Sequence, residues 1–273
     1  MTPEKKHGFT IVEVMVFLAV SGLIFLIAAQ FINGKQTQVE FTQGMNNANL
    51  IVRAMIDNVA NGNYPWPSHA YLQCNGGSPA GFTSYATQQP VSVGCSMIGE
   101  VMAPETNGNP YEYSLYPVVG CQYASCNNVS QVQPTTLADI EPNVVSQMIQ
   151  SSNWPGEVKI NSMYVVSTSG HTSAGAFGVF ATLPQDSGGG ILQNGSQPTQ
   201  AIELSSITSV SPDDKSQILT EVNNAAPLPA NDYILMCFEG PNNKKASITI
   251  GGLNGGGQLT TSLGLANGAD PLC

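Results

Sequence analysis

Positively charged side chains are scarce in this sequence. Only 8 of the 273 residues are lysine or arginine, against 18 aspartates and glutamates, and the formal net charge is −10. Nucleic-acid binding draws most of its affinity from basic side chains that neutralise phosphates, so the bulk charge argues against DNA or RNA as a partner. Beyond the first eight residues, Lys244 and Lys245 form the only adjacent basic pair, which is typical of a solvated turn.

The sequence also lacks a recognisable catalytic or metal-binding constellation. Its three histidines are scattered, no cysteine pair has Cys-x-x-Cys spacing, and no Gly-x-Ser-x-Gly segment marks a nucleophilic serine. His171 stands near Ser169 and Ser173, but no acid partner is recognisable. Asp213 and Asp214 do not follow the spacing of an EF-hand calcium loop. The sequence therefore predicts a protein that is not an enzyme and that holds no metal or cofactor.

One long run without charge lies near the start of the chain. The 19 residues 14–32 carry no charged side chain, and only Ser21 and Gln30 among them are strongly polar. At about 1.5 Å per residue, an α-helix of this length nearly crosses the roughly 30 Å hydrocarbon core of a bilayer. Lys5 and Lys6 precede the run, which predicts a cytoplasmic N-terminus with the rest of the chain outside. A cleaved secretory signal peptide is the alternative, but its apolar core is usually shorter.

The residues around this run resemble the processing site of type IV pilin-like proteins. The segment KKHGFTIVE has that family's order: a short basic leader, a glycine, a phenylalanine, a threonine, and a glutamate as the fifth mature residue. The resemblance implies that a prepilin peptidase cleaves between Gly8 and Phe9 and methylates the new amine of Phe9. It also implies that Glu13 pairs with such an amine, either four residues away in its own helix or, when subunits stack, in a neighbouring subunit, where the pair sets the register of assembly. The resemblance reaches only to about residue 35.

The family resemblance implies a structural function. The chain is then a pilin, a minor pilin or a type II secretion pseudopilin, made as a precursor in the cytoplasmic membrane and polymerised into a cell-surface or periplasmic filament. Its implied partners are the prepilin peptidase, other pilin subunits and the inner-membrane assembly platform. Gln30 stands where many major pilins have a proline, which favours a minor pilin or a pseudopilin. An uncleaved, membrane-anchored adhesin or binding protein is the alternative.

Helical periodicity continues beyond the apolar run. Six apolar residues recur every three or four positions, which places them on one stripe of an amphipathic helix; they are Phe41, Met45, Ala48, Val52, Met55 and Val59. The segment NGNYPWP at 61–67 ends this helix with a glycine and two prolines. Runs rich in β-branched residues predict strands at 158–168, 176–183, 201–210, 232–240 and 246–252. Short helices are predicted around 142–151 and over 211–225.

These elements predict an α+β fold. A long N-terminal helix, with a membrane-spanning lower half and an amphipathic upper half, packs on an antiparallel β-sheet head. Residues 63–129 are rich in Gly, Pro, Asn and Ser and predict disulfide-stapled loops with short strands. The predicted organisation is a leader peptide at 1–8, a transmembrane and filament-core helix at 9–33, its amphipathic continuation at 34–62 and an extracytoplasmic head at 63–273.

Six cysteines follow the apolar run, which indicates disulfides on the outer side of the membrane. They are Cys74, Cys95, Cys121, Cys126, Cys237 and Cys273. Six cysteines allow fifteen connectivities, and pairing neighbours in sequence predicts 74–95, 121–126 and 237–273. The last pair resembles the disulfide-bounded C-terminal region of many pilins, and closing that loop is expected to stabilise the head by about 3–4 kcal/mol.

Overall fold

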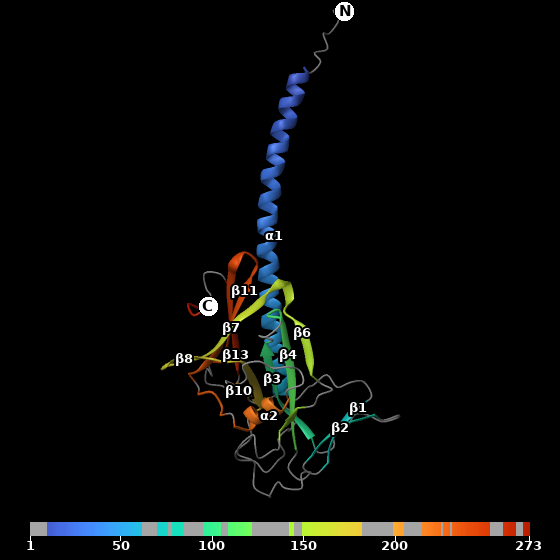
Figure 1. The fold of residues 1–273 in the computed structure, drawn as a ribbon, viewed down its shortest axis with the longest axis vertical. Helices are drawn as coiled ribbons and strands as arrows, with labels where there is room; N and C mark the ends of the chain where they lie inside the picture. Colours follow the sequence, from blue (N-terminus) through green and yellow to red (C-terminus); the bar gives the residue numbers. More distant parts are fainter. Residues whose placement is uncertain are drawn as a thin grey trace, which may run out of the picture.

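A single long helix dominates the structure. The computed structural model describes residues 10–61, 70–75, 78–84, 95–104, 109–121, 142–144, 149–181, 199–204, 215–224, 226–229, 231–251, 259–265 and 270–273. Helix α1 (Ile11–Asn61) runs for 51 residues, about 77 Å at the standard rise. Its N-terminal half projects from the head as a stalk, and its C-terminal half runs beside the strands (Figure 1). The long N-terminal helix is confirmed.

Antiparallel strands build the head. The larger sheet among the described residues has six strands in the order β10–β9–β3–β4–β5, with β6 also paired to β4; the second has five in the order β13–β12–β11–β7–β8. In the larger sheet the bounds are β3 (Cys95–Pro104), β4 (Glu112–Cys121), β5 (Asn143–Val144), β6 (Gln150–Asn153), β9 (Ala176–Ala181) and β10 (Thr199–Leu204). In the second they are β7 (Lys159–Ser167), β8 (Gly170–Ser173), β11 (Tyr233–Gly240), β12 (Lys244–Gly251) and β13 (Thr260–Leu265). A separate hairpin joins β1 (Ala70–Asn75) to β2 (Ser78–Ser84).

Two hydrophobic cores lie on opposite faces of the six-stranded sheet, because successive side chains of a strand point to opposite faces. The first core lies between α1 and both sheets, and it contains all six residues of the predicted helical stripe, each buried: Phe41, Met45, Ala48, Val52, Met55 and Val59. The second core includes Phe180 of β9 together with Ile218 and Val222 of α2 (Lys215–Asn224). The helix therefore contacts two sheets, where the sequence predicted one.

Helix α1 meets the head most closely at the turn Pro155–Glu157. A Cβ atom on Gly44 would lie 2.6 Å from the carbonyl oxygen of Pro155 and 2.9 Å from Cγ2 of Val158. Gly156, which faces Gly44 across this contact, has φ +72°, a left-handed conformation that glycine adopts without steric cost. The stalk is thus held at its exit from the head by direct backbone contact, which two glycines permit.

Most of the strands predicted in the second half of the chain are confirmed. The predicted runs 158–168, 176–183 and 232–240 contain β7, β9 and β11, and the run 246–252 overlaps β12, which begins two residues earlier at Lys244. Residues 182, 183 and 252 lie outside the described residues. The run 201–210 overlaps β10, which begins two residues earlier at Thr199, and residues 205–210 lie outside the described residues. The predicted helix at 211–225 is confirmed as α2.

The helix predicted around 142–151 is wrong at both of its ends, while residues 145–148 lie outside the described residues. Asn143 and Val144 pair with Val119 and Val118 as β5, and β6, which begins at Gln150, pairs with the start of β4. Val144 is buried beside its partner in the second core. Pairing with a neighbouring strand and burial of a β-branched side chain outweigh a weak local preference for helix.

The interpretation of residues 63–129 as loops with short strands is also wrong in part. Strands β3 and β4, ten residues each, form the centre of the larger sheet. Gly99 lies where the β3–β4 register shifts, and its missing side chain leaves room for the ring of Phe180. Glycine in a strand thus marks a bulge and a close packing contact here, not a turn. Strand β13, which pairs with β12 near the C-terminus, was not predicted from the sequence.

Candidate assembly site at the N-terminal helix

Thr10 and Glu13 form a reciprocal cap at the start of α1. The backbone N–H of Thr10 donates to Glu13 Oε2 over 3.1 Å, and the backbone N–H of Glu13 donates to Thr10 Oγ1 over 3.3 Å. The Thr10 hydroxyl also donates to Glu13 Oε2. This is a capping box, which satisfies N–H groups that the first helical turn leaves without a partner. The T-x-x-E pattern is visible in the sequence, but Glu13 was predicted only to act in assembly and not to cap the helix.

The first half of α1 exposes apolar side chains on all sides. The 18 residues Ile11–Ala28 have a mean hydropathy of 2.7, and none of them is buried by the rest of the chain. Phe17 and Phe25, for example, are 71% and 72% exposed. An 18-residue helix is about 27 Å long and is therefore close to the thickness of a hydrocarbon core. By length and composition this segment fits a membrane span, and Glu13 lies at its N-terminal end.

The processing site itself lies outside the described residues. Gly8 and Phe9 precede Thr10, the first residue described, so only the Glu13 end of the predicted pair is visible. Glu13 is exposed and engages the Thr10 donors through Oε2. The structure therefore presents a carboxylate at the start of the stalk that is already hydrogen-bonded within its own helix.

The C-terminus is anchored on the five-stranded sheet. Cys237 of β11 forms a disulfide with Cys273, with 5.3 Å between their Cα atoms, which confirms the predicted 237–273 pair. Cys74, Cys95 and Cys121 lie in β1, β3 and β4, and the register places the backbones of Cys95 and Cys121 opposite each other. Cys126 lies outside the described residues. The predicted pairs 74–95 and 121–126 stay predictions.

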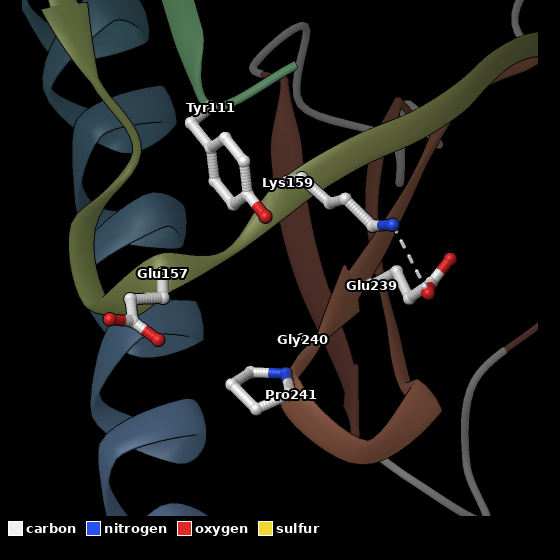
Figure 2. A pocket seen from close by; sticks show the side chains of 6 residues that line it. All are labelled: Tyr111, Glu157, Lys159, Glu239, Gly240 and Pro241. Atoms are coloured by element: carbon white, nitrogen blue, oxygen red, sulfur yellow. Dashed lines mark ion pairs between the residues drawn. The ribbon is translucent and has the colours of Figure 1, made fainter. Parts of the chain in front are cut away.

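An open pocket of about 540 Å³ lies beside the turn at which α1 leaves the head. It is lined by Tyr111, Glu157, Lys159, Glu239, Gly240 and Pro241. Figure 2 shows Lys159 and Glu239 paired on one side, with 3.2 Å between Nζ and Oε1, and Glu157 on the other side near α1. Within the described part of the chain, no group of three or more acidic, histidine or cysteine side chains is placed to hold a metal ion.

The residues considered for catalysis are not brought together. His171 is exposed on β8 and packs edge-on against Tyr164, with 5.4 Å between the ring centroids. Ser169 hydrogen-bonds to Ser167 and not to His171: 2.9 Å separates the two Oγ atoms, and the backbone N–H of Ser169 also donates to Ser167 Oγ. Asp213 and Asp214 lie outside the described residues.

Comparison with known proteins identifies the N-terminal segment. Residues 4–29 match the family model described as the prokaryotic N-terminal methylation motif. No curated protein and no solved structure matches the chain. The matched range includes Gly8, Phe9, the Thr10–Glu13 cap and the exposed apolar helix, and it ends before the head begins. The chain thus carries the N-terminal signature of type IV pilin-like proteins.

Proposed function

We propose that this chain is a structural subunit of a type IV pilus-like filament and has no catalytic activity. It is made as a precursor in the cytoplasmic membrane, cleaved after the leader at 1–8 and N-methylated on Phe9. The helix at 9–33 holds it in the membrane and then forms the filament core. Its continuation at 34–62 carries the head at 63–273, which faces the cell surface or the periplasm in the filament.

The exposed apolar stalk is the observation that carries this proposal. A helix that is hydrophobic on every side needs lipid or protein around it, and no other described part of this chain covers Ile11–Ala28. A bilayer surrounds the stalk in the precursor. Stalks of neighbouring subunits can replace that bilayer in a filament, because apolar helices pack as well against one another as against lipid tails.

The outer face of α1 extends this contact surface beyond the membrane segment. Val39 and Leu50 are 55% and 59% exposed. Val39 lies just before the buried stripe of α1, and Leu50 lies within the length of that stripe. They are eleven residues apart, close to three helical turns, and therefore share one face. This face supports helix-to-helix packing between subunits above the membrane level.

The charge of Glu13 sets the axial alignment of neighbouring subunits in the filament. After cleavage, Phe9 carries a cationic amine, and Glu13 lies four residues further along the helix. In a low-dielectric filament core a lone charge is costly, whereas a paired one is largely compensated. The proposed partner of the Glu13 carboxylate is the Phe9 amine of a neighbouring subunit.

Two measurements test the proposal. Mass spectrometry of the protein isolated from its cells is expected to show a chain that begins at N-methylated Phe9; an intact Met1 would refute processing and support the membrane-anchored binding protein. Glu13→Gln is expected to be processed and inserted but poorly incorporated into filaments. Asp57→Asn, which neutralises an exposed acid on the same helix, is the matched control and is expected to assemble normally. Equal incorporation of both variants contradicts the register function of Glu13.

A further inference from the structure

Glu100 is a buried carboxyl group at the centre of the larger sheet. It lies on β3 between β4 and β9, opposite Pro117 on one side and Val179 on the other. The side chain is only 2% exposed, and its Oε2 atom has no hydrogen-bond partner. Buried polar groups are nearly always paired, so an unpaired carboxyl oxygen at this position is unusual.

The side chain of Glu100 faces helix α1. Directly opposite residues in neighbouring strands share a face, and Val179, the partner of Glu100, belongs to the core between α1 and the sheets. Met102, two positions further along β3, belongs to the same core. Helix α1 packs against both β3 and β9, and Figure 1 shows β3 beside the head portion of α1. Glu100 therefore lies in the helix–sheet contact.

No described cation neutralises Glu100. The buried stripe of α1 contains no ionisable residue, and its charged residues Arg53 and Asp57 are exposed. From β9 only apolar side chains face this core. From β4 the titratable residue is Tyr113, whose pKa is raised by burial and, to a smaller extent, by repulsion from Glu100, so it stays neutral. By strand alternation the side chain of Lys244 of β12 points to the same core. Lys244 nevertheless does not lower the pKa of Glu100, because burial is the only cause that shifts this pKa.

The folded protein therefore holds a proton on Glu100 more tightly than the unfolded chain does. Burial raises the pKa of Glu100 from 4.5 to about 7. The neutral side chain is tolerated in the core, whereas the ionised one is not. The stability that this proton confers is complete below pH 4.5, falls as the pH rises and is lost once the pH passes about 7.

We propose that Glu100 is a proton-controlled latch between α1 and the six-stranded sheet: the neutral carboxyl keeps α1 docked on the sheet, and the carboxylate loosens that contact. The Glu100 carboxylate lies on the face of β3 that packs against α1. Water therefore reaches the carboxylate most directly when α1 lifts from the sheet. The latch makes the mobility of the head on its stalk depend on external pH. This inference holds for a filament subunit and for an anchored protein alike.

Hydrogen exchange of the full-length chain in detergent tests the latch. After correction for the intrinsic pH dependence of exchange, the opening equilibrium constant of amides in the buried half of α1 is expected to rise by roughly ten- to a hundredfold between pH 5 and pH 8. Glu100→Gln, which is neutral at every pH, is expected to remove this rise. Glu203→Gln, at a partly exposed acid of β10 in the same sheet, is the control and is expected to retain it.

Three outcomes decide the proposal. A rise confined to α1 and the six-stranded sheet, and absent from Glu100→Gln, supports it. Profiles that are the same in the wild-type protein and in Glu100→Gln overturn it. An equal rise in the amides of β11 and β12 also overturns it, because that result indicates global destabilisation and not release of α1. Should Glu100→Gln fail to fold, ¹³C NMR titration of labelled glutamates in the wild-type protein remains decisive: a Glu100 carboxyl already ionised at pH 5 refutes the latch.

Discussion

The disulfide between Cys237 and Cys273 is expected to make a measurable contribution to the stability of the head. It closes a loop with a sequence separation of 36 and fastens the last four described residues to the five-stranded sheet. Hydrogen bonds hold the same segment: Lys245 Nζ donates to the carbonyl oxygen of Cys273 over 2.7 Å, and the backbone N–H of Asp270 donates to Ser247 Oγ over 3.2 Å. A side-chain hydrogen bond also joins Asp270 to Tyr233. Without the covalent link, such hydrogen bonds would have to hold a chain end that gains conformational freedom on release.

The size of the effect follows from the length of the loop. In the chain-entropy model, cross-linking a loop of this length stabilises the folded state by about 4 kcal/mol. These hydrogen bonds contribute only about 1 kcal/mol each and are partly lost with the cross-link. The double variant Cys237→Ala with Cys273→Ser is therefore expected to lower the free energy of unfolding by about 3–4 kcal/mol. For a domain of this size, that corresponds to a fall in Tm of roughly 6–16 °C.

Urea unfolding followed by tryptophan fluorescence is a suitable assay, because Trp154 is buried between Tyr113 and Phe238 with ring centroids 4.4 and 5.1 Å away. The full-length chain is compared in detergent under non-reducing conditions. Lys245→Met is the control, since it removes one hydrogen bond to the C-terminus and keeps the disulfide; it is expected to cost about 1 kcal/mol. If the cysteine variant unfolds at the same urea concentration and with the same slope as the wild-type protein, the reasoning from loop closure is refuted.

Three further changes probe the helix and its contacts. Gly44→Ala is expected to lower the free energy of unfolding by about 1–3 kcal/mol because the new methyl group meets the turn at Pro155; Gln43→Ala, at an exposed neighbouring position, should leave it nearly unchanged in the same urea assay. Leu50→Asp is expected to reduce filament incorporation without changing the unfolding midpoint, whereas Asn47→Asp, also exposed, should assemble normally. Glu100→Gln is expected to stabilise the head at pH 8 by at most about 3 kcal/mol and to have little effect at pH 4.5; equal stabilisation at both pH values contradicts the shifted pKa.

Local patterns in the sequence were sufficient for the parts of the fold that depend on one segment. Helix α1 follows from an apolar run continued by a stripe at helical spacing, and that stripe is buried from Phe41 to Val59. Strands such as β11 and β12 consist largely of β-branched and apolar residues and are bounded by turn residues. The 237–273 disulfide joins the two cysteines that follow all the others in the chain.

The parts that the sequence did not reveal depend on contacts between distant segments. Gly99, Pro104 and Pro117 read locally as turn residues, yet all three lie in the two central strands of the larger sheet. Gly99 is accommodated there because Phe180, from a strand far along the chain, packs against it. The same limit applies to Glu100: an acid in the apolar run MIGEVMA was visible, but its burial becomes apparent only once α1 and β9 are in place.

The two interactions of Glu13 explain how one carboxylate is compatible with both the precursor and the proposed filament. In the isolated chain the capping box satisfies it locally, and such caps are worth about 0.5–2 kcal/mol. An unpaired acid costs about 2.5–3.5 kcal/mol at the bilayer centre and less at the end of a span, where Glu13 lies. Exchanging the cap for the cationic amine of a neighbouring subunit keeps the carboxylate paired in the apolar filament core. An amide oxygen still accepts the Thr10 N–H, so Glu13→Gln retains the cap and loses only the charge. Poor assembly of that variant, with normal processing and insertion, therefore isolates the ion pair from the cap.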